Sequence, residues 1–187
     1  MRGYVGVTDS GWYRFNKLSN NKEIVFWRKS STPVGIQPGE YFFLLVRGHL
    51  PRSIKGYGVV GHVDIKSPIE LWENYGKKNG CNSLNELEFI LHKTNNAKVA
   101  YYYLTDVVYF DNEKIITDEE IGFAKDIMAG KFISGEKLSQ IVDYYKNGKK
   151  PNFEKISKSE NNSEVAEIEI KRYRKIKNKK SYVCFKH

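Results

Sequence analysis

Residues 37–65 constrain the fold of this chain more than any other stretch, because they predict two core strands joined by a loop. Tyr41 to Val46 form a run of aromatic and large apolar residues behind a Pro-Gly turn signal, which indicates a buried strand. Residues 58–65 predict a second strand that contains Gly58 and Gly61. Glycine inside a strand usually marks a β-bulge or a close approach by another backbone, so we expect an irregular hairpin here.

The loop between these two predicted strands, residues 47–57, is cationic and contains no acidic residue. Cationic side chains on a loop that two core strands hold in place are well positioned to contact phosphate groups. We therefore expect a loop that binds the nucleic-acid backbone, with the candidate residues Arg47, His49, Arg52, Lys55 and Tyr57.

The rest of the chain shows short strand and helix patterns without an internal repeat. These patterns predict strands at residues 4–8, 24–28 and 99–110, and helices after Asp9 and at residues 68–75, 84–93, 121–128 and 135–145. The strands are too variably spaced for a simple parallel α/β sheet. We therefore expect an α+β fold, a curved and partly closed β-barrel with peripheral helices.

Length and cysteine content limit the class of protein. A chain of 187 residues is long enough for one domain with a substantial core. No segment is apolar over the length of a membrane span, and the N-terminus begins as a strand and not as a signal peptide. Because the chain has only two cysteines, it cannot carry a disulfide framework, and we expect a protein of the reducing cytoplasm.

The net charge of +9 is concentrated at the C-terminal end. Residues 171–187 contain eight Lys and Arg and no acid, which leaves 23 basic and 22 acidic residues in the remainder. A basic tail is either a solvated terminus or a contact for phosphates, and both readings stay open here. We place a boundary near residue 150, between a body at 1–150 and a basic extension at 151–187. Alternating residues predict a β-hairpin in the extension, which either completes the body or leads to an effector domain.

The sequence contains no clear pattern for a metal site or a catalytic loop. The four histidines have no ligand spacing with one another or with the cysteines, and phosphate-loop and nucleophile motifs are absent. We therefore expect no metal and no cofactor. One alternative is Glu169-Ile170-Lys171, whose Glu-x-Lys form occurs in metal-dependent nucleases but here lacks a second acid nearby. Alternating Glu and Lys on an exposed strand would explain the same residues.

Trp27 is the aromatic residue that we single out for binding. It ends a predicted strand and is followed by Arg28, Lys29 and Ser30. A flat ring beside cations and a hydroxyl group has the composition of a base-stacking pocket. Lys29 and Ser30 are also candidates for contacts to the nucleic-acid backbone.

Asp9 and Ser10 follow the first predicted strand, and Trp12 comes shortly after them. Asp9 is placed either to cap the helix that follows or to contact the edge of a base, and we leave both roles open. Asp9, Ser10 and Trp12 therefore join Trp27 and Arg28 as candidate pocket residues.

Several short motifs, taken in order, resemble the EVE branch of the PUA-like superfamily. They are VGVTD at residues 5–9 with a Trp-Tyr pair behind it, VFW at 25–27, QPGE at 37–40 and LTDVVYF at 104–110. The resemblance covers residues 3–145, and the nearest relatives are modification-reading domains at the N-terminus of McrB-type GTPases and HNH endonucleases. It implies a small, twisted, EVE-like and PUA-like β-barrel with peripheral helices.

In this superfamily an altered base is flipped out of its strand and held in an aromatic cage. By this resemblance Trp27 is a cage wall, Asp9 contacts the base edge, Arg28 replaces the serine of YTH readers, and Trp72 or Tyr75 closes the cage. The resemblance implies a non-catalytic module that reads a modified base in double-stranded DNA. Its partner would be the GTPase motor or nuclease of a modification-dependent restriction system in phage defence. A PUA-like module that binds RNA by itself is the alternative.

Overall fold

The computed structural model describes residues 2–48, 52–94, 96–110, 116–123 and 129–148, which all belong to one compact unit. Its elements are β1 (Arg2–Thr8), α1 (Ser10–Leu18), β2 (Ile24–Trp27), β3 (Tyr41–Val46), β4 (Ser53–Lys66), α2 (Pro68–Tyr75), the 3-10 helix η1 (Gly76–Asn79), α3 (Leu84–Leu91), β5 (Val99–Tyr109), β6 (Ile116–Thr117), β7 (Gly130–Ser134) and α4 (Gly135–Asn147). The predicted hairpin of the extension and the Glu169-Lys171 pair lie outside the described residues.

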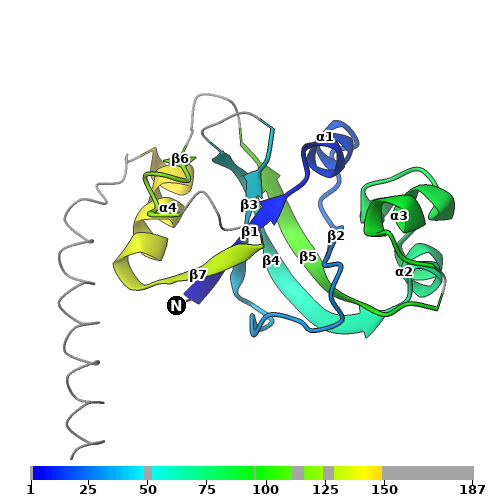
Figure 1. The fold of residues 1–187 in the computed structure, drawn as a ribbon. Helices are drawn as coiled ribbons and strands as arrows, with labels where there is room; N and C mark the ends of the chain where they lie inside the picture. The colour runs from blue at the N-terminus through cyan, green and yellow to red at the C-terminus, as the bar shows by residue number, and fades with distance from the viewer. Residues whose placement is uncertain (1, 49–51, 95, 111–115, 124–128, 149–187) are drawn as a thin grey trace, which may run out of the picture. The chain divides into compact units, whose positions relative to one another are not determined.

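A single mixed sheet of seven strands organises these elements, in the order β2-β5-β4-β3-β1-β7 with β6 paired to β4. β1 and β3 run parallel, and the other pairs are antiparallel. Figure 1 shows α2 and α3 beside one end of the sheet and α4 beside β7 at the other. The α+β class is thus confirmed. Within the described ranges β2 and β7 do not pair, so the predicted barrel is an open sheet here.

The expected irregular hairpin is present, and both glycines sit at its irregularities. β4 shifts register against β5 between Tyr57 and Val59 and again between Val60 and His62, at the positions of Gly58 and Gly61. A Cβ on Gly58 would lie 3.0 Å from the Leu104 side chain, so the neighbouring strand approaches closely. The predicted role of both glycines is confirmed.

The cationic loop is shorter than the sequence predicted. β4 begins at Ser53, which pairs with Val46 at the end of β3. Lys55 and Tyr57 therefore belong to a strand and not to a loop. Both side chains are half-buried, and they lie on the five residues, 53–57, by which β4 extends the predicted strand at its N-terminal end.

The two faces of the sheet bury different cores. Alternation along β5 directs Tyr102 and Leu104 into one core, which also holds Trp12 and Phe42. Tyr101 and Tyr103, which alternate with them, face a second core, in which the sheet packs against α2 and α3. The side chains of a strand alternate between faces, so each face acquires its own set of apolar partners.

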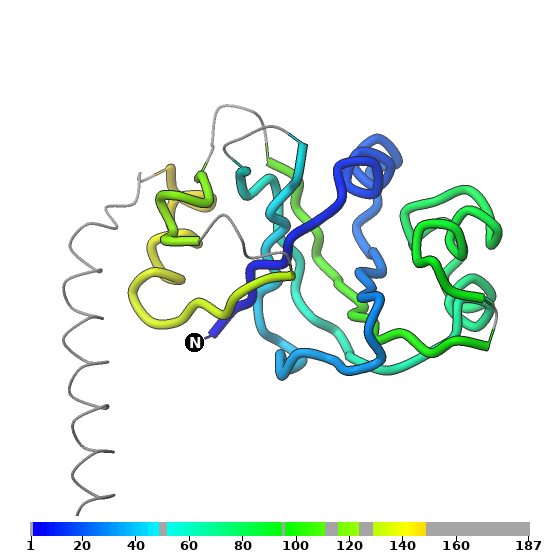
Figure 2. The backbone as a smooth tube through the Cα atoms, in the orientation of Figure 1, coloured from blue at the N-terminus to red at the C-terminus, as the bar shows by residue number. Residues whose placement is uncertain are grey.

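Local capping explains where the helices begin. Asp9 is the N-cap of α1, and its Oδ1 accepts hydrogen bonds from the backbone N–H of Gly11 at 2.8 Å and Trp12 at 3.0 Å. Ser67 and Glu70 form a reciprocal capping box at the start of α2. The chain therefore passes from β1 directly into α1 and returns to the sheet as β2, a path that Figure 2 follows in blue.

The prediction of a helix at 121–128 is wrong for residues 121–123, the part of it that the structure describes. Ile121 to Phe123 continue a turn that follows β6, and residues 124–128 lie outside the described residues. The backbone N–H of Phe123 donates to the carbonyl of Asp118 at 2.8 Å, which closes this turn. In the part of the chain that the structure describes, no helix is long and apolar enough to cross a membrane.

Candidate functional site

A pocket of about 480 Å³ opens where the sheet fails to close. Its lining comes from both ends of the strand order, with β2 on one side and β1 and the residue before β7 on the other. The end of β3, the start of α1 and the segment after β2 complete it. The lining residues are Tyr4, Val7, Asp9, Trp12, Phe26, Trp27, Arg28, Lys29, Ser30, Arg47 and Ala129.

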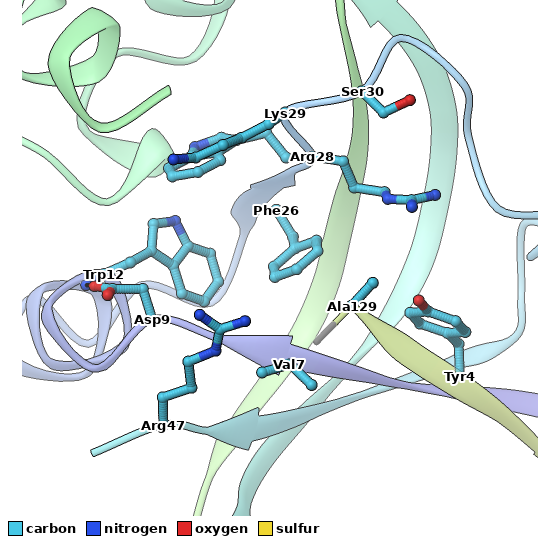
Figure 3. A pocket seen from close by; sticks show the side chains of 11 residues that line it. Tyr4, Val7, Asp9, Trp12, Phe26, Arg28, Lys29, Ser30, Arg47 and Ala129 are labelled. Atoms are coloured by element: carbon cyan, nitrogen blue, oxygen red, sulfur yellow. Dashed lines mark hydrogen bonds between the residues drawn. The ribbon is translucent and has the colours of Figure 1, made fainter. Parts of the chain in front are cut away.

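The inner wall of the pocket is aromatic and apolar. Trp12 is buried and meets the half-buried ring of Phe26 edge to face, with ring centroids 5.7 Å apart. Tyr4 and Val7 from β1 add further apolar surface. Figure 3 shows the rings of Trp12 and Phe26 at the centre of the view, with Val7 below them. Such a wall suits a flat, apolar ligand group.

The rim of the pocket is predominantly cationic. Lys29 and Arg47 are exposed, and the half-buried Arg28 lies close enough to Tyr4 to oppose part of the rise that burial causes in the pKa of the Tyr4 hydroxyl. In Figure 3 the Arg47 side chain extends from the end of β3 toward Trp12 and Phe26. Asp9 is the acid of this rim, and its Oδ1 is already occupied by the helix cap.

Trp27 has two environments. Its neighbour in the pair with β5 is Tyr101, which faces the helical layer, and Trp27 packs against both cores. The indole Nε1 donates to the carbonyl of Asn79 at 3.3 Å. Because β2 is the edge strand, the half-buried indole also reaches the pocket. Trp27 therefore contributes to the pocket and to the packing of the helices.

The structure brings seven of the predicted site residues to this one pocket. They are Asp9, Trp12, Trp27, Arg28, Lys29, Ser30 and Arg47. Ser10 begins α1 beside the pocket without lining it, and His49 lies outside the described residues. Lys55 and Tyr57 lie in β4 away from the lining, where Tyr57 packs against other aromatic rings.

Arg52 must be removed from the predicted phosphate-binding set. It is only 7% exposed, and its Nε lies 2.8 Å from Oδ2 of Asp118, which is 2% exposed. Its guanidinium group also lies over the ring of Phe123, 5.5 Å from the centroid. Through these two contacts, Arg52 links the start of β4 to the turn after β6.

Trp72 and Tyr75 do not close the pocket. α2 packs on the opposite face of the sheet, so Trp72 joins the core of the helical layer. The Tyr75 hydroxyl lies 3.0 Å from Nε2 of His62 and 2.9 Å from the Tyr101 hydroxyl. Burial, followed by the hydrogen bond with Tyr75, raises the pKa of Tyr101. None of these residues lines the pocket, so this cluster is separate from it.

Four lining residues were not predicted: Tyr4, Val7, Phe26 and Ala129. Alternation marks the first three as strand residues, and strand aromatics are core by default. These residues line a pocket because the sheet is open at this edge, and no local sequence pattern predicts an open edge. Among the described residues no group of three or more His, Cys, Asp or Glu side chains could hold a metal ion.

Comparison with known proteins identifies the fold. No family model and no curated protein matches the chain. Three similar solved structures are those of ASCH from Zymomonas mobilis and of variants with a Tyr-to-Phe or a Ser-to-Ala substitution. Their TM-scores are 0.52, 0.53 and 0.56 at 16–17% sequence identity, and the match covers 74% of this chain and 94–96% of theirs. At this level of identity, the likeness shows that the chain shares the fold of these ASCH structures.

Proposed function

We propose that this chain is a non-catalytic nucleic-acid-binding module that holds one unstacked base in the pocket at the open edge of the sheet. One observation carries the proposal: an aromatic wall and a cationic rim meet in a single pocket of about 480 Å³. Nucleotides combine a flat ring with a phosphate group, and the pocket offers surface for both.

The aromatic wall supplies the energy for holding a base. Stacking of a base on an aromatic side chain contributes roughly 1–3 kcal/mol. Extruding a base from a duplex costs a few kcal/mol, and less when the base is damaged, mismatched or already single-stranded. Trp12, Phe26 and Trp27 line the pocket, and stacking of a base on their rings would offset that cost.

The charges of the rim indicate where the phosphates would lie. Arg28, Lys29 and Arg47 surround the opening, so phosphates on either side of the bound base would meet a cation. Asp9 repels phosphates and therefore faces the donor groups of the base or sugar. Its Oδ1 is committed to the cap of α1, which leaves Oδ2 as the acceptor for the ligand.

We propose further that the ligand is double-stranded DNA with a modified base, read for the motor or nuclease of a modification-dependent restriction system. The motif order of the EVE branch supports this choice. The alternative is a module that binds RNA by itself, because unpaired RNA bases enter a pocket without the cost of flipping.

Binding of the full chain to a matched panel of nucleic acids tests the proposal. The panel contains duplexes that differ in one base, unmodified, methyl-adenine, methyl-cytosine or hydroxymethyl-cytosine, and single-stranded RNA of the same sequence. We expect one modified duplex to bind at least about tenfold more tightly than its unmodified partner, as a difference of 1.4 kcal/mol requires. Equal binding of all duplexes together with tighter binding of RNA would favour the alternative. Absence of binding to any member would refute both.

The rim cations are expected to set the salt dependence of binding. Arg47→Ala and Lys29→Ala should each weaken modified and unmodified DNA equally and lower the slope of log K against log salt by about one. The matched control is Lys98→Ala, because Lys98 is exposed and paired with Glu70 at 2.7 Å beside α2. The control should leave the slope unchanged. Unaltered slopes in both rim variants would place the phosphate contacts elsewhere.

A further inference from the structure

Both tryptophans of the pocket rest on one turn of the helical layer, formed by Asn79 and Gly80 at the end of η1. The Trp27 indole donates to the carbonyl of Asn79 at 3.3 Å. The Trp12 indole lies directly against Gly80, where an added Cβ would be 2.2 Å from Cδ1 and 2.5 Å from Nε1 of the ring. Neither Asn79 nor Gly80 lines the pocket.

This turn is held firmly in place. Asn79 is fully buried, and its Nδ2 donates to the carbonyls of Leu71 and Gly76, each at 2.9 Å. The backbone N–H of Gly80 donates to the carbonyl of Lys77 at 3.0 Å. Gly80 has φ +78°, a left-handed conformation that favours glycine. The position of the turn is therefore fixed by α2 and η1, which contribute no residue to the lining of the pocket.

We propose that the Asn79–Gly80 turn is the positioning element of the pocket and sets its selectivity for a base through Trp12 and Trp27. The missing side chain at Gly80 lets the Trp12 indole lie against the turn, and the Asn79 carbonyl fixes the orientation of the Trp27 indole. A change at Gly80 should therefore alter base selection although the residue touches no ligand. This inference rests on the proposed function for the ligand, while the placement of the indoles can be tested without it.

The experiment compares Gly80→Ala with Gly148→Ala in the full chain. Both glycines are left-handed, with φ +78° and +74°, but no atom of the described residues lies within 4 Å of a Cβ on Gly148. Both variants carry similar backbone strain, and only Gly80→Ala pushes on Trp12. We expect Gly80→Ala to lower the preference for the best ligand of the panel by about fivefold or more, as loss of part of one stacking contact implies. Gly148→Ala should leave the preference unchanged.

A second variant keeps the test valid if Gly80→Ala folds poorly. Trp12→Ala removes the whole indole, including the Cδ1 and Nε1 atoms that the new methyl group would overlap. In the Trp12→Ala background, Gly80→Ala should have no further effect on base preference, because the two residues act through one contact. Equal effects of Gly80→Ala in both backgrounds would overturn the inference, as would equal preferences of Gly80→Ala and Gly148→Ala.

Tryptophan fluorescence separates this inference from the proposed function. The chain contains three tryptophans, so Trp27→Phe combined with Trp72→Phe leaves Trp12 as the sole reporter. In that background Gly80→Ala should shift the Trp12 emission and Gly148→Ala should not. If no nucleic acid binds but the shift is present, the proposed function fails and the positioning of Trp12 stands. If nucleic acid binds and the shift is absent, the inference fails alone.

Discussion

Asp118→Ala is expected to lower the free energy of unfolding by about 3–5 kcal/mol, because it removes the carboxylate that is paired with the buried guanidinium group of Arg52. The pair is close, at 2.8 Å, and both side chains are shielded, at 8% and 2% exposure. For a domain of this size the loss corresponds to a fall in the melting temperature of roughly 6–20 °C. Thermal and urea unfolding of the full chain measure it.

Two comparisons identify the cause of this loss. Arg14→Ala removes an exposed arginine outside the pocket and should change the stability by no more than about 0.5 kcal/mol. The double variant Arg52→Met with Asp118→Leu removes both charges and should recover most of the stability, because an apolar pair of similar size avoids the cost of burying charge. A single variant as stable as the wild type would show that the pair is solvated and that Arg52 is available to phosphates after all.

Trp27→Ala is expected to lose both base preference and stability. The preference for the modified base should fall by roughly 1–3 kcal/mol, which is the contribution of one stacking contact. Stability should fall by about 3 kcal/mol, the low end for a Trp-to-Ala change, since the ring is half-buried. Competition between modified and unmodified duplex measures the first effect, and thermal melting measures the second.

The matched control for this prediction is Trp72→Ala. Trp72 is also half-buried and packs in the core of the helical layer, but it lies outside the pocket. The Trp72→Ala variant should be less stable than the wild type and should keep the same base preference. Trp27→Phe keeps a stacking ring and loses the hydrogen bond to Asn79, so it should retain most of the preference and cost about 1 kcal/mol of stability. If Trp27→Ala and Trp72→Ala reduced the preference equally, Trp27 would have no special place in binding.

The features that the sequence predicted correctly depend on residues that are close together in the sequence. The predicted helices after Asp9 and at residues 84–93 are present because Asp9 and Ser83 each place an oxygen acceptor two or three residues before unsatisfied backbone N–H groups. Gly58 and Gly61 mark the bulges of β4 because only glycine lets the adjacent strand come so close. The order of short motifs around Asp9 and Trp27 also placed a candidate site at residues that now share one pocket.

Only the tertiary structure decided which residues are accessible and which face they occupy. Arg52 looks like a loop cation until Asp118, 66 positions away, is found beside it. Trp72 and Tyr75 fall on the wrong face of the sheet for the pocket because α2 packs behind β4 and β5. The pocket itself exists because β1 pairs with β3 and β7 while β2 stays at the other edge. The periodicity of a strand or a helix can be read from neighbouring residues. Which strand lies at an edge, which face a side chain occupies and which buried partner it meets depend on pairing between distant segments. The free energy of that pairing is not encoded in any local pattern.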